Sequence, residues 1–134
     1  MVVVKRILLA LALAHIVAGF ALTFLPFAPS AHAQLVRVIF GEGKGSSEVL
    51  FLVSVFGPTV ASWGILFYSL TTSFFRNPTA CSWRALVLSI LVWAPFDSAL
   101  CIYYGLKFAV AFNAVIAVIF LGLLFTLRGL AYNK

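Results

Sequence analysis

Long apolar runs are the feature that most limits what this chain can fold into. Four stretches carry almost no charge and reach about 18 residues or more, the length that a helix needs to cross the hydrocarbon core of a bilayer. Hydrophobic residues make up 64% of the 134 residues and charged residues only 9%, whereas roughly a quarter of an ordinary soluble domain is charged. The sequence therefore predicts an all-α integral membrane protein, a bundle of four transmembrane helices.

The polar stretches between these runs set the predicted boundaries. We expect a single membrane domain over residues 1–134, with an outer connector at residues 28–48 that is rich in glycine and serine toward its end. Residues 34–40 (QLVRVIF) are too few to cross and are predicted to lie at the membrane surface between the first two spans. The four spans are predicted at about residues 7–27, 49–74, 83–104 and 106–127.

Proline interrupts both central spans. Gly57-Pro58 lies in the second span and Pro95 in the third. Because proline removes a backbone hydrogen bond and clashes with the preceding turn, we expect a helix kink at Pro58 and another at Pro95. Gly105 separates the last two spans by so few residues that it predicts a tight turn.

The first span also resembles a secretory signal. Lys5 and Arg6 come before the apolar run, and Ala31-His32-Ala33 follows it as a small-residue cleavage pattern. However, the apolar stretch is about 20 residues long, and a signal core usually has about 7 to 15. We therefore expect a retained span, with cleavage after Ala33 as the alternative.

The basic residues predict the orientation. Most of them lie next to span ends, which is where orientation signals and lipid contacts belong, and they form no stripe that could follow a nucleic acid. We therefore expect membrane lipids as partners and no nucleic acid. We expect a bacterial inner membrane with both termini on its cytoplasmic side, because this orientation puts most of the basic residues on that side. They are Lys5, Arg6, Arg76, Arg84, Arg128 and Lys134. The outer side then holds Arg37, Lys44 and Lys107.

A few polar side chains fall at membrane depth. A charged group there costs at least about 2.5 kcal/mol, so it needs a partner or a function. Helical rise places Asp97 about 10 Å below the outer surface and Asn113 about 9 Å below it. We expect one polar layer in the outer half, with His15 just beneath it. The candidates for a ligand or proton site are Asp97, Asn113, His15, Ser54 and Thr59.

This layer has two interpretations. In the structural one, Asn113 hydrogen-bonds Asp97 and holds two helices together. In the functional one, Asp97 binds a cation or proton, and His15 relays a proton to it through water. No nucleophile lies beside a base, and His15, Asp97 and the distant Cys81 and Cys101 do not form a tetrahedral set. We expect no catalytic residue, no metal site and no cofactor.

The remaining features favour a protein that works by contact. The chain contains 14 phenylalanines, more than four short helices can bury among themselves, so many must face lipid or protein. Small residues recur at the four-residue spacing that allows close helix packing, in the pairs Ala14/Ala18, His15/Gly19 and Gly57/Ala61. We expect a non-enzymatic accessory or structural subunit that packs against a larger membrane complex or its own copies. A small transporter or ligand-binding protein is the alternative, and a lipid-modifying enzyme is the third.

Overall fold

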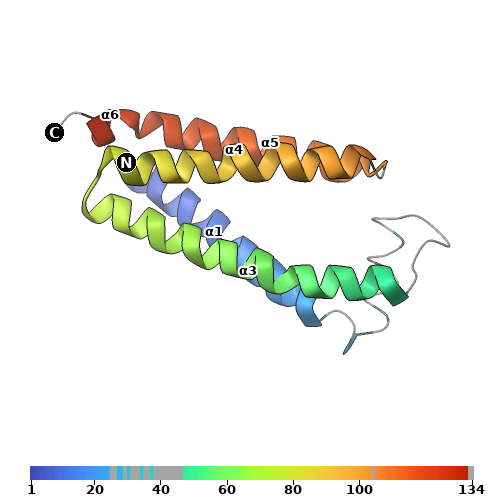
Figure 1. Cartoon of the computed structure of the whole chain (residues 1–134). Coiled ribbons are helices and arrows are strands. Elements are labelled where there is room, and N and C mark those ends of the chain that lie inside the picture. Colours follow the sequence, from blue (N-terminus) through green and yellow to red (C-terminus); the bar gives the residue numbers. More distant parts are fainter. Residues whose placement is uncertain are drawn as a thin grey trace. The chain divides into compact units, whose positions relative to one another are not determined.

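The computed structural model describes residues 1–24, 27, 28, 30, 34, 37, 47–103 and 105–132. Within them the protein contains helices and no strand. Ala31-His32-Ala33, the glycine-rich stretch and most of the predicted surface segment lie outside the described residues. The helices in Figure 1 are α1 (Val2–Phe24), α3 (Ser47–Arg76), α4 (Ala80–Tyr103), α5 (Lys107–Thr126) and α6 (Arg128–Tyr132).

Among the described residues, three helical segments are long and apolar enough to cross a membrane: Val2–Phe24, Ala80–Tyr103 and Ala109–Thr126. They correspond to the first, third and fourth predicted spans and are consistent with an integral membrane protein. The second predicted span lies within α3, a helix of 30 residues. That α3 also crosses, and that the helices bend, stay predictions. Pro58 and Pro95 lie inside α3 and α4 without ending them.

Some helices extend beyond the predicted spans. Lys5 and Arg6 lie inside the first two turns of α1, not before the helix, because helical hydrogen bonds do not stop where hydrocarbon ends. The helix α4 begins at Ala80, and the preceding Thr79 accepts a hydrogen bond from the backbone N–H of Ser82 at 3.1 Å. This bond caps the first turn and satisfies an otherwise unpaired donor. In the sequence, the threonine directly after Pro78 indicates this helix cap.

The tight turn predicted at Gly105 is present. Gly105 has a φ of +73°, a left-handed conformation that glycine adopts without a steric penalty. Its N–H donates to the carbonyl of Ile102 at 3.0 Å, and the N–H of Leu106 donates to that of Cys101 at 2.8 Å. These two bonds close the end of α4 in a Schellman motif, so α5 turns back along α4 at once.

The chain divides into two compact units. The first consists of Met1–Ala10 with Phe67–Lys134, and the second is Leu11–Leu66. The first unit therefore contains the hairpin of α4 and α5, the short α6, the start of α1 and the end of α3. The second contains the rest of α1 and α3. The single membrane domain stays a prediction.

The core of the first unit lies along the α4–α5 hairpin, whose two helices run side by side in Figure 1. Leu86 and Ile90 of α4 and Phe120 and Leu124 of α5 have no exposed surface. The ring of Phe67, from the end of α3, meets Phe120 edge-on with centroids 4.9 Å apart. Such edge-to-face contacts add to the packing of large rings.

In the second unit, α1 and α3 meet through glycines. A Cβ atom added to Gly19 would lie 2.6 Å from the carbonyl oxygen of Gly57, and one on Gly64 would lie 2.8 Å from Cγ1 of Ile16. Ala61 is also buried at this contact. Small residues thus let the two backbones approach closely, as the four-residue spacings of Gly57/Ala61 and His15/Gly19 indicated.

Candidate functional site

The candidate site lies on the α4–α5 hairpin, in the first unit. Asn113 of α5 donates a hydrogen bond from Nδ2 to Oδ2 of Asp97 on α4. Asn113 is only 5% exposed, whereas Asp97 is half-buried. The structure therefore brings together the two polar residues that helical rise had placed at similar depth. Their role as a ligand or proton site stays a prediction.

Cys101 belongs to the same group and was missing from the predicted site. It lies one turn after Asp97 on α4, and its thiol Sγ is 4.0 Å from Oδ2 of the carboxylate. The signal was available, since residues four apart share a helix face. A thiol is a weak donor, so it supplements the amide of Asn113 without replacing it.

Both contacts of the carboxylate end on the same oxygen. The Asn113 amide and the Cys101 thiol reach Oδ2, and among the described residues no donor reaches Oδ1. An ionised carboxylate accepts several hydrogen bonds, and in an apolar setting each one offsets part of the cost of burying it. Hydrogen bonds to Oδ2 thus hold Asp97 in place, while Oδ1 can accept a further hydrogen bond.

His15 lies in the second unit and has local partners of its own. Its Nδ1 is 2.8 Å from the carbonyl oxygen of Leu11. Because a carbonyl only accepts, Nδ1 must carry the proton in this bond. The imidazole also lies against the indole of Trp63, with ring centroids 4.8 Å apart. These contacts are those expected of a packing histidine.

The two remaining candidates, Ser54 and Thr59, also belong to the second unit, on α3. Ser54 is half-exposed and Thr59 is exposed. Of the five candidate residues, the structure thus brings together two, Asp97 and Asn113. The wider layer with Ser54, Thr59 and His15, and any acid–base pair of Asp97 with His15, stay predictions.

Among the described residues, no three His, Cys, Asp or Glu side chains gather closely enough to hold a metal ion. Comparison of the chain with protein-family models, with curated proteins and with solved structures gave no match.

Proposed function

We propose that this protein is a small, non-enzymatic, four-span subunit that packs against a larger membrane complex or its own copies. In this proposal α3 supplies the fourth span, and both termini lie on the cytoplasmic side of a bacterial inner membrane. The bond between Asp97 and Asn113 then serves to hold α4 and α5 together.

The observation that carries the proposal is an exposed apolar stripe along α5. Its residues lie on one helix face at intervals of three, three and seven positions, and more than half of each is exposed: Phe112 at 55%, Val115 at 58%, Val118 at 70% and Phe125 at 53%. Lipid tails can cover such a face. However, the stripe also contains Gly122, where an added Cβ would meet nothing within 4 Å. A glycine on an apolar face lets the backbone of another helix approach closely, which lipid tails do not require.

Photo-crosslinking in native membranes tests this proposal. A benzophenone amino acid at Val118 should yield a discrete adduct, either with a larger membrane protein or with a second copy of the chain. Gly122→Leu should abolish the adduct, because the added side chain separates the two backbones. Ala85→Leu on the exposed surface of α4 adds the same bulk elsewhere and should leave the adduct unchanged. A strictly monomeric protein in mild detergent, with no adduct in membranes, would end the proposal.

A second candidate function is a transporter or ligand-binding protein that uses Asp97, Asn113 and His15. The observation in its favour is the half-buried Asp97 carboxylate, whose Oδ1 accepts no bond from the described residues. Four helices are few for alternating access, so this version requires a dimer. Flux of protons or monovalent cations into vesicles should then disappear in Asp97→Asn and persist in Ser98→Ala. Equal flux in both variants would exclude it.

A further inference from the structure

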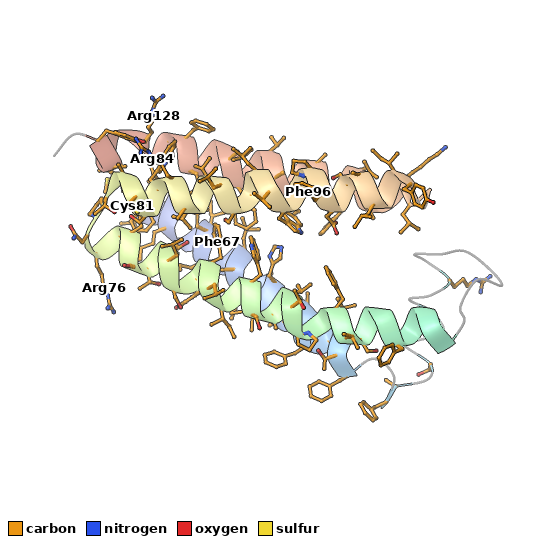
Figure 2. All side chains as sticks on the ribbon, viewed as in Figure 1. Phe67, Arg76, Cys81, Arg84, Phe96 and Arg128 are labelled. Carbon is orange, nitrogen blue, oxygen red and sulfur yellow. The ribbon has the colours of Figure 1, made fainter. Side chains whose placement is uncertain are left out.

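Two arginines converge on one tyrosine ring at the end of the α4–α5 hairpin. The guanidinium carbon of Arg84 lies 5.7 Å from the ring centroid of Tyr132, and that of Arg128 lies 5.9 Å from it. The Nε of Arg84 also donates a hydrogen bond to the Tyr132 hydroxyl at 2.9 Å. Figure 2 shows both arginines at this end, beside α6. We call Arg84, Arg128 and Tyr132 the arginine–tyrosine cluster.

A buried tryptophan packs against the tyrosine of the cluster. Trp83 is 7% exposed, and its Nε1 donates to the carbonyl oxygen of Leu124 near the end of α5, at 2.7 Å. Its ring meets Tyr132 edge-on, with centroids 5.8 Å apart. Because the indole is fixed by both helices, it holds the tyrosine ring, and through it the two arginines, in a defined position.

The charge of the cluster is not balanced within the described residues. The whole chain has three acidic residues. Among them, Asp97 comes 13 positions after Arg84 on the same helix, a rise of about 20 Å. Arg84 also lies in the second turn of α4, near the positive end of the helix dipole. Two guanidinium groups thus lie beside one tyrosine ring, and an anion bound there would offset their repulsion.

The position of the cluster identifies the kind of anion. Arg84 lies near the start of the candidate span Ala80–Tyr103, and Arg128 follows the end of Ala109–Thr126. The boundary of the hydrocarbon is where tryptophan, tyrosine and arginine gather and where lipid phosphates lie. Guanidinium groups bind phosphate through paired hydrogen bonds. Both arginines are exposed and can therefore reach such a group.

We propose that the arginine–tyrosine cluster is a binding site for the phosphate of an anionic phospholipid, with phosphatidylglycerol as the probe. Arg84 and Arg128 bind the phosphate oxygens, and Tyr132 keeps the two guanidinium groups apart and directed outward. The site is independent of the proposed subunit function, since it needs no protein partner.

Native mass spectrometry of the full chain in a neutral detergent tests the site. Without a bilayer there is no surface potential, so bound lipid reports a specific contact. Phosphatidylglycerol should bind more tightly than phosphatidylcholine. Arg84→Gln and Arg128→Gln should each weaken phosphatidylglycerol binding on the order of tenfold, the effect of losing one charge-assisted hydrogen bond. Arg76→Gln is the matched control, because Arg76 is an exposed arginine of the same unit outside the cluster.

Three results would overturn the proposal. One is equal binding of the two lipids, and another is an equal loss in Arg76→Gln, which would mean a general charge effect. The third is displacement of phosphatidylglycerol by millimolar inorganic phosphate, which would identify a site for soluble anions. Tyr132→Phe keeps the ring and removes the 2.9 Å bond to Arg84, so it should weaken binding less than Arg84→Gln. Thermal unfolding of each variant shows that the fold is intact.

Discussion

At the residue scale, the amide of Asn113 is the principal hydrogen-bond partner of Asp97. Among the described residues, Asp97 is the only acidic residue in a candidate span. Asn113→Leu removes this donor and leaves Asp97 to be satisfied by the weaker thiol of Cys101. We expect the free energy of unfolding in mixed micelles to fall by about 1 to 3 kcal/mol. Ser89→Ala is the control, since Ser89 bonds only to the carbonyl of Leu86 in its own helix. It should change stability by less than about 0.5 kcal/mol.

A double variant separates the lost bond from lost packing. Asp97→Leu combined with Asn113→Leu removes both polar partners, and replacing a buried polar pair by apolar groups can be nearly neutral. The double variant should therefore recover most of the stability that Asn113→Leu loses. If Asn113→Leu alone were as stable as the wild type, the bond would not stabilise the hairpin.

The sequence could predict this pair because of one glycine. Asp97 and Asn113 lie equally far before and after Gly105, so a tight turn there brings them opposite each other in an antiparallel hairpin. The same register brings Arg84 and Arg128 to the same Tyr132 ring, although the distribution of basic residues predicts only that both lie on the cytoplasmic side of the membrane. His15 has no such constraint, because a long segment separates α1 from α3. Ser54 and Thr59 lie on α3, which only residues 77–79 separate from α4, but they belong to the second unit and Asp97 to the first. Their place in the polar layer therefore stays a prediction.

At the scale of helices, the contact between α1 and α3 depends on backbone proximity. A Cβ atom on Gly57 would lie 2.6 Å from the backbone nitrogen of Thr23, which cannot move aside as a side chain would. Gly57→Ala should therefore force the helices apart and lower the free energy of unfolding by about 1 to 3 kcal/mol. Gly122→Ala makes the same change where nothing lies within 4 Å. In the monomeric protein, without a partner helix on α5, it should raise stability by up to about 1 kcal/mol, because alanine favours the helix. Equal effects in the two variants would contradict the close contact.

Spacing alone did not identify which small residues meet. Gly57, Ala61 and Gly19 lie in the contact, but Ala14 and Ala18, at the same spacing, are exposed. In an apolar helix nearly every face looks alike, so the pattern lacks the polar side that orients a soluble helix. The position of the neighbouring helix decides which spacing is used. Gly64 belongs to no predicted pair, yet it packs against Ile16 because α1 lies on that side of α3.

At the scale of the whole molecule, composition predicted long apolar helices, and the described residues contain three that are long and apolar enough to cross a membrane, which is consistent with an integral membrane protein. Composition could not establish that α3 crosses. Its end contributes Phe67 and Phe74 to the core of the first unit. In the same unit, the Lys5 ammonium lies 5.7 Å from the ring centroid of Phe75. The start of α1 and the end of α3 thus lie together, which supports an arrangement in which α1 and α3 cross in opposite directions.

Accessibility of single cysteines to a membrane-impermeant maleimide tests that arrangement. In a Cys81→Ser, Cys101→Ser background, Lys5→Cys and Arg76→Cys should both react only from the cytoplasmic side, and Lys107→Cys only from the outside. Lys5 and Arg76 share a side only if α1 and α3 both cross or neither does, whereas Arg76 and Lys107 lie on opposite sides only if α4 crosses. A three-span protein in which α1 crosses and α3 does not would expose Lys5→Cys and Arg76→Cys on opposite sides. That result would remove the fourth span and, with it, the shared polar layer predicted for α3, α4 and α5.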